Sequence, residues 1–273
     1  MANTADLMWL STAVPSIVTS SLILNLNPST YTSGATWNDS SVSGYNATLV
    51  ASPTFTSAGL GSYFTFNGST QYAKVPTGAT GLDNLGKNAS GMTYSAWINP
   101  QNITNCPPII GKGNGAAGAG QKFSLMLSGG TTNAIETLFD SSGNGADKGA
   151  SFVNTGMSFN NWFNVVFTKD DGSNVGTTSQ LHIYVNGVEY ATSSGVSTVW
   201  QASTSGTNSS DAVYDTNIGY EDTADFFLGG TGSGYAAPRF AAMKFGQILI
   251  YNKMLTSVEV AQNFAATRIN YGV

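Results

Sequence analysis

Short runs in which apolar and polar residues alternate recur along the chain, and they constrain its fold more than any other feature. Residues 22–26 and 181–185 alternate in this way, with clusters of Gly, Asn, Ser and Thr between such runs. Alternation of this kind is typical of strands with one buried face. Asn186-Gly187 predicts a β-hairpin, and residues 123–127 and 135–139 predict another. We therefore expect an all-β protein, an antiparallel two-sheet sandwich.

One helix is predicted, near the C-terminus. Thr256 and Glu259 have the spacing of a capping box, in which each side chain binds a backbone amide at the start of the helix. Leu255 and Val260 form the matching hydrophobic staple. Val260 and Phe264 are one turn apart, so we expect this face of the helix to pack on the sandwich.

The composition excludes several classes of binding partner. Hydrophobic residues make up 41% of the chain, enough for a sizeable core, while charged residues make up 9% and the net charge is -5. Ten Lys and Arg residues are too few for binding through phosphate neutralisation, so nucleic acid is excluded. No apolar run approaches the ~20 residues that a spanning helix needs, so membrane insertion is excluded. Cys106 and His182 each occur once, which excludes an internal disulfide and a zinc cluster.

We expect a single domain, residues 21–273, preceded by an N-terminal arm, residues 1–20. The start of the chain lacks the positive residues of a secretory signal, so synthesis in the cytoplasm is expected. Residues 111–120 and 201–234 are rich in Gly, Ser and Thr and are expected to be loops that make variable contacts. The apolar arm residues expected to dock on a neighbouring molecule are Trp9, Leu10, Ile17 and Val18.

The order of these elements resembles a known family. The matching pieces are Tyr63–Pro76, Tyr94–Asn99, Ile110–Gly113, Asn161–Thr168, Leu181–Val188, Asn217–Gly219 and Ile248–Thr256. In this order they resemble the concanavalin A-like lectin and glucanase superfamily, specifically its laminin-G-like jelly-roll branch. The resemblance implies two curved sheets whose concave face or rim of loops binds glycans or proteins, often with one Ca²⁺. Hydrolases, lectins, adhesion modules and virion components share this fold, so function must be argued from the site.

The sequence predicts no enzymatic activity. Glycoside hydrolysis needs two carboxylates about 5–10 Å apart, and the hydrolases that the chain resembles carry them in a Glu-x-Asp-x-x-Glu run or a close variant. The glutamates here, Glu136, Glu189, Glu221 and Glu259, form no such run. His182 lies in the middle of a predicted strand and is expected to be structural.

Candidate ligand and metal residues lie mainly near the long acidic segment. The resemblance places a Ca²⁺ site, if one is present, at Asp140 and at Asp222 or Asp225; no other cofactor is expected. Aromatic residues that could stack on a sugar, together with one glutamate, are Trp200, Tyr214, Tyr220, Glu221 and Tyr235. The same aromatics could instead cap the sandwich edge or lie in a subunit contact. Trp97 and Trp162 match core positions of the family and are expected to be structural.

Two functions from different classes fit these features. The first is a virion structural protein of a bacteriophage, such as a capsid decoration, fibre or knob subunit. Sparse charge and a surface rich in Ser, Thr, Asn and Gly suit close packing against copies of itself and other virion proteins. The alternative is an extracellular carbohydrate-binding or adhesion module at a cell surface, with glycans as partners and Ca²⁺ as an optional ligand. We expect the first function, because no export signal is present.

Overall fold

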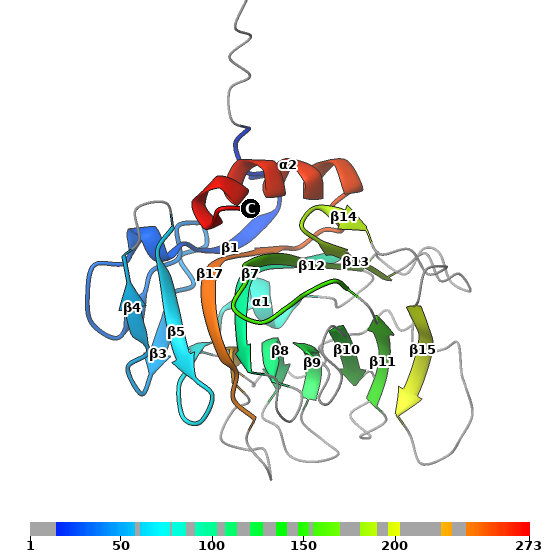
Figure 1. The fold of residues 1–273 in the computed structure, drawn as a ribbon, viewed down its shortest axis with the longest axis horizontal. Coiled ribbons are helices and arrows are strands. Elements are labelled where there is room, and N and C mark those ends of the chain that lie inside the picture. Colours follow the sequence, from blue (N-terminus) through cyan, green and yellow to red (C-terminus); the bar gives the residue numbers. More distant parts are fainter. Residues whose placement is uncertain are drawn as a thin grey trace, which may run out of the picture.

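The computed structural model describes residues 15–57, 61–76, 78–85, 91–102, 107–113, 121–127, 135–140, 147–152, 155–169, 181–189, 196–202, 225–230 and 239–273. Within these residues the strands form two antiparallel sheets that lie face to face (Figure 1). Sheet A contains β1 (Leu22–Leu26), β4 (Thr54–Thr56), β5 (Tyr63–Asn67), β7 (Met92–Asn102), β12 (Phe163–Lys169), β13 (Leu181–Val185), β14 (Val188–Glu189) and β17 (Ala242–Tyr251). Sheet B contains β2 (Thr36–Trp37), β3 (Ala47–Val50), β6 (Tyr72–Val75), β8 (Pro108–Gly113), β9 (Gln121–Leu127), β10 (Ile135–Asp140), β11 (Asp147–Phe152), β15 (Val196–Ala202) and β16 (Phe226–Leu228). The all-β sandwich is confirmed.

The order of strands in each sheet brings distant parts of the chain together. Sheet A has the order β14-β13-β12-β7-β17-β5-β4, and β1 also pairs with β17. Sheet B has the order β15-β11-β10-β9-β8-β16-β6-β3-β2. The long strand β17 therefore joins β7 on one edge to both β5 and β1 on the other. The last strand of the chain, β17, thus connects the two halves of sheet A.

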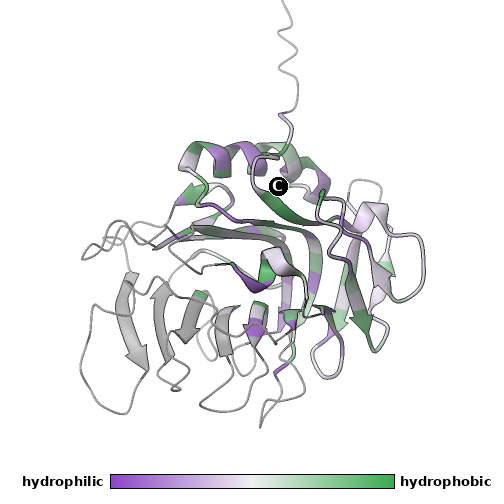
Figure 2. Ribbon diagram, turned by 180° about the vertical axis from the view of Figure 1, so that it is seen from behind, coloured by the Kyte–Doolittle hydropathy of each residue, from purple (hydrophilic) through white to green (hydrophobic). Residues whose placement is uncertain are grey.

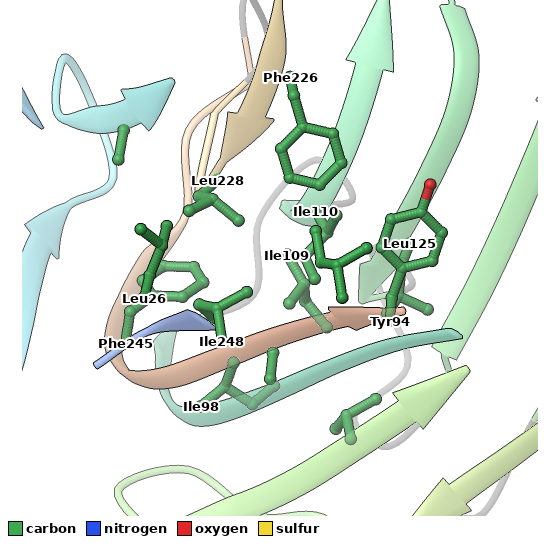
Figure 3. Packing of buried hydrophobic residues seen from close by; sticks show 14 of the residues in the cluster. Leu26, Tyr94, Ile98, Ile109, Ile110, Leu125, Phe226, Leu228, Phe245 and Ile248 are labelled. Carbon is green, nitrogen blue, oxygen red and sulfur yellow. The ribbon is translucent and has the colours of Figure 1, made fainter. Parts of the chain in front are cut away.

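The main core lies between the sheets (Figure 3). Ile98 and Ile248 of sheet A and Ile110 and Leu228 of sheet B are each fully buried in it. Alternate residues of each strand supply these side chains, because successive side chains of a strand point to opposite faces. Burying one such side chain stabilises the fold by about 1.5–3 kcal/mol. Burial of these alternate apolar side chains is therefore what stabilises the sandwich.

Both predicted hairpins are confirmed. Residues 135–139 of β10 pair with residues 123–127 of β9. Asn186 and Gly187 join β13 to β14 with φ values of 52° and 77°. Positive φ at both central positions is the type I′ geometry, whose twist matches that of the flanking strands.

The predicted helix is present as α2 (Ser257–Thr267) on the outer face of sheet A (Figure 1). Its capping box forms as expected: the Thr256 side chain accepts from the amide of Glu259, and the Glu259 carboxylate accepts from the amide of Thr256. The helix carries both hydrophobic and hydrophilic residues (Figure 2). Val260 is fully buried beneath it with Leu255, so the staple is confirmed. A 3-10 turn, η4 (Arg268–Tyr271), follows α2.

Residues 17 and 18 of the predicted arm pack within this same chain. Val18 is buried in the cluster beneath α2, and Ile17 packs against that cluster. The backbone amide of Val18 donates to Asn263 Oδ1 at 2.8 Å, and Tyr251 donates from its hydroxyl to the carbonyl of Val18 at 3.0 Å. These two arm residues are thus covered by the chain itself. Trp9 and Leu10 lie outside the described residues, and docking of the arm on a neighbour stays a prediction.

Several short elements were not expected. Residues 226–228 fall in the predicted loop 201–234, yet they form β16 in the middle of sheet B. Residues 111–113 fall in the predicted loop 111–120, yet they belong to β8, because the ladder holds them between β9 and β16. Helix α1 (Thr80–Asp83) is a single turn fixed by Leu82 in the core, and the 3-10 turn η1 (Pro28–Thr30) is equally short. Elements of three or four residues are too short to show a hydrophobic period.

Across the described part of the chain, no helix has both the length and the apolar character needed to cross a bilayer.

Candidate functional site

The face of sheet B that points away from the core is marked by a row of directly paired residues. From β3 to β9 the row contains Thr48, Lys74, Phe227, Gly111 and Ser124. Their chain neighbours Ala73, Phe226 and Leu228 lie in the core. Because side chains alternate along a strand, the row lies on the outer face of sheet B.

Tyr72 forms the centre of an aromatic group on this face. Its ring centroid lies 6.0 Å from that of Phe227 and 6.1 Å from that of Phe240. Phe227 is buried, whereas Tyr72 and Phe240 are partly exposed. A Cβ atom at Gly230 would lie 2.7 Å from the Cβ of Tyr72, so a side chain there would displace the tyrosine. Gly230 therefore lets the two partly exposed rings lie against the sheet.

A closed ion pair lies beside these rings. Lys74 Nζ is 2.7 Å from Asp225 Oδ2, and the two side chains are 33% and 23% exposed. The hydrogen bond to Asp225 raises the pKa of Lys74 above its ordinary value, while partial burial opposes that rise. Lys74 is therefore positively charged at neutral pH, and the carboxylate of Asp225 neutralises that charge. We call Tyr72, Lys74, Asp225, Phe227 and Phe240 the Tyr72 face.

Only one of the predicted ligand or metal residues has a side chain that the structure describes. This is Asp225, whose carboxylate is bound by Lys74. Asp140 ends β10 and Trp200 lies in β15, where the structure gives their ladder positions. The predicted residues that lie outside the described residues are Tyr214, Tyr220, Glu221, Asp222 and Tyr235.

The sheet does not bring Trp200 near Asp225. The outer row continues from Ser124 through Leu138 and Gly149 to Trp200. Trp200 is therefore six strands from Lys74, about 29 Å along the sheet at about 4.8 Å per strand. The ladder pairs Asp140 with Asp147. The described part of the chain contains no group of three or more His, Cys, Asp or Glu side chains that could hold a metal ion.

Each carboxylate whose side chain the structure describes has a defined partner. Asp39 accepts from the amides of Asn25, Ser41 and Tyr45, and Glu189 lies 2.5 Å from His182 Nδ1. Burial and the negative charge of Glu189 raise the pKa of the adjacent Tyr184 to about 12. The remaining carboxylates pair as Asp83 with Lys112, Asp225 with Lys74 and Glu259 with Lys253. These described carboxylates hold the structure together, and none is paired with a second carboxylate.

The Tyr72 face was not predicted from the sequence. A usable signal was present: in Tyr72-Ala-Lys-Val75, the apolar Ala73 and Val75 alternate with Tyr72 and Lys74. This alternation places Tyr72 and Lys74 together on the non-core face of one strand. Asp225 was named only as a candidate metal ligand, and its place in this site could not be found in this way, because Asp225 directly precedes β16 and Phe227 belongs to it, a strand that the sequence did not reveal.

Comparisons with known proteins agree with the fold. The family model described as Concanavalin A-like lectin/glucanases superfamily matches residues 67–261, well over half of the chain. No curated protein matches the chain. Trypanosoma rangeli sialidase in complex with sialic acid is similar to it, with a TM-score of 0.59 and 18% identity over 96% of this chain and 37% of the sialidase. The binding domain of botulinum neurotoxin DC in complex with rat synaptotagmin II has a TM-score of 0.60 and 15% identity over 92% of this chain and 52% of that one.

These similarities are to parts of longer proteins, and at such identities they show the fold, a jelly-roll sandwich. They contradict the prediction of a bacteriophage structural protein, because the similar structures are sialidases and toxin receptor-binding domains. The family match fits the alternative, a carbohydrate-binding module, better than the virion role. Sparse charge and a surface rich in Ser, Thr, Asn and Gly misled the prediction, since both describe how a surface is hydrated and not what it binds.

Proposed function

Because this chain belongs to the concanavalin A-like lectin/glucanases superfamily, we propose that it is a non-enzymatic carbohydrate-binding module and that the Tyr72 face contacts the glycan. The observation that carries the proposal is the partly exposed Tyr72 ring, held between Phe227 and Phe240 beside the ion pair of Lys74 and Asp225. Sites for small ligands typically combine aromatic side chains with a few placed polar groups.

The chemistry of the Tyr72 face suits a neutral sugar. The apolar face of a pyranose ring packs on an aromatic ring, which contributes contact area at low cost in side-chain entropy. An ammonium group has three N–H donors and a carboxylate accepts through two oxygens, so the pair can bind sugar hydroxyls from both sides. The pair carries no net charge, and it therefore gives no electrostatic preference for an acidic sugar.

The proposal includes neither catalysis nor a required Ca²⁺ ion at this face. Hydrolysis of a glycoside needs an acid and a second carboxylate across the sugar, whereas Asp225 is bound to a lysine. Ca²⁺ needs several oxygen ligands, and the ammonium of Lys74 at Asp225 Oδ2 opposes a second cation at this carboxylate. We therefore expect glycan binding here to persist in the presence of a chelator.

The test is a glycan array with the full chain, followed by calorimetric titration of the best neutral oligosaccharide. Tyr72→Ala should weaken binding about tenfold, the effect of losing about 1.4 kcal/mol of ring contact. Tyr72→Phe, which keeps the ring, is the matched variant and should bind within a few-fold of the wild type. Val42→Ala, at a fully exposed position elsewhere, is the control for substitution itself. Equal binding by Tyr72→Ala and the wild type would overturn this assignment.

A further inference from the structure

A second aromatic surface lies on the outer face of sheet A, beyond the C-terminal end of α2. The Trp162 ring centroid is 5.6 Å from that of Tyr63 and 4.8 Å from that of Tyr271. All three rings are partly exposed. Trp162 thus differs from the expected core residue, whereas Trp97 is buried and stacks under Tyr271 at 4.5 Å. We call Tyr63, Trp162, Tyr271 and the adjacent Lys244 the aromatic ledge.

The ledge is fixed in position by backbone contacts. The Tyr271 ring lies against Gly246, where a Cβ atom would be 2.5 Å from the ring. The amide of Gln247 donates to the Tyr271 hydroxyl at 2.7 Å. Burial raises the pKa of Tyr271 well above its ordinary value, although this hydrogen bond opposes the rise. The hydroxyl therefore stays neutral, and the ring is a rigid support for Trp162.

Lys244 gives the ledge a positive charge that no described carboxylate neutralises. Its ammonium lies 5.1 Å from the centroid of the Tyr63 ring, a cation–π contact. In the described part of the chain, Lys74, Lys112 and Lys253 each lie within 3.1 Å of a carboxylate oxygen, whereas Lys244 forms no ion pair there. The cation–π contact holds the ammonium in place and leaves its charge available to an anion.

Polar residues flank Lys244 in the sheet. The ladder pairs Lys244 with Thr65 on one side and with Asn99 on the other. Gln101 donates to the Asn99 side chain at 2.5 Å. Asn99 is buried, so the Thr65 hydroxyl and the Gln101 amide are the partly exposed polar groups beside Lys244 on this sheet. These are groups that bind sugar hydroxyls.

We propose that the aromatic ledge is a second carbohydrate site, distinct from the Tyr72 face, and that it binds a sugar residue bearing one carboxylate. The ring of such a sugar would pack on Trp162 and Tyr63, and its carboxylate would accept a charge-assisted hydrogen bond from Lys244. A single ammonium matches a single carboxylate. A polyanion such as nucleic acid would need a row of cations, and the chain has a net charge of -5.

The experiment compares oligosaccharides that contain a uronate or sialate with their methyl esters, which keep the sugar and lose the charge. The full chain should bind at least one acid about tenfold more tightly than its ester, as expected for one hydrogen bond to a charged group. Lys244→Gln should abolish this difference, and Lys253→Gln, which removes a lysine bound to Glu259, should leave it unchanged. Trp162→Ala should weaken acid and ester alike, whereas Trp162→Phe should retain most binding.

Three results would overturn the proposal. One is equal binding of every acid and its ester. Another is a preference for acids that survives Lys244→Gln. The third is Lys244-dependent binding of a polyglutamate peptide when no acidic sugar binds, which would make the ledge a site for acidic protein segments. Tyr72→Ala separates the two sites: it should impair neutral-sugar binding and leave binding of the acid intact.

Discussion

The Tyr72 face and the aromatic ledge are built from the same kinds of residue, yet they present different charges. Each combines partly exposed aromatic rings with a lysine on the outside of a sheet. Lys74 is 2.7 Å from a carboxylate oxygen, whereas Lys244 lies over a tyrosine ring and forms no ion pair within the described residues. The comparison teaches that aromatic residues define a surface for sugar rings, while the partner of the nearby lysine decides which charge that sugar carries.

The largest expected effect comes from a reciprocal pair of glycine substitutions. Gly246→Ala places a Cβ atom 2.5 Å from the Tyr271 ring, and Gly230→Ala places one 2.7 Å from Tyr72 Cβ. Overpacking of this kind costs about 1–3 kcal/mol in the free energy of unfolding. Gly246→Ala should abolish the binding of acidic sugars and spare that of neutral ones, and Gly230→Ala should do the reverse. Calorimetric titration of both variants with an acidic and a neutral sugar checks this. Loss of binding to both sugars in either variant would contradict the claim that the two surfaces are separate sites.

A smaller effect is expected when the ion pair between Lys74 and Asp225 is removed. Asp225→Asn leaves Lys74 with its charge and removes the carboxylate that neutralises it. The Tyr72 face should then gain a preference of about tenfold for an acid over its methyl ester. The measurement is best made in the Lys244→Gln background, where the ledge no longer contributes. An unchanged ratio of acid to ester binding would show that lysine pairing does not set the charge preference.

The smallest effect concerns α2, which leads into the turn that carries Tyr271. Burial alone would raise the pKa of Glu259, but hydrogen bonds from Lys253 and Thr256 outweigh it and lower the pKa below 4.5. Because the folded pKa is lowered, the carboxylate stabilises the protein above pH 4.5, and this contribution is lost as the pH falls through the folded value. Glu259→Gln should reduce the free energy of unfolding by about 1 kcal/mol at neutral pH. Urea unfolding of both proteins should converge in acid, and a constant difference at all pH values would contradict this role.

Much of the fold could be predicted from the sequence because its signals are local. Alternating apolar residues indicated the strands, Asn186-Gly187 indicated a hairpin, and Thr256 with Glu259 indicated the start of α2. Each signal depends on residues within a few positions of one another. The short strand β16 gave no such signal, since three apolar residues show no period.

The candidate site could not be predicted in the same way, because it is assembled by long-range pairing. Lys74 and Asp225 are 151 residues apart in the chain and meet only because β16 lies beside β6. Trp162 was expected to be a core residue, but its exposure depends on where η4 places Tyr271. Apart from Asp140, the aromatic and acidic candidates named from the sequence came from residues 200–235, whereas the structure builds its surfaces from several segments of the chain.

The central claim, that the Tyr72 face binds carbohydrate, is tested most directly by mapping chemical shifts. The isotope-labelled full chain would be titrated with a neutral oligosaccharide selected on the glycan array. The account predicts that the largest amide shifts occur in β6 and β16, at Tyr72–Val75 and Phe226–Leu228. Shifts confined to other elements, or no shift with any oligosaccharide, would contradict it.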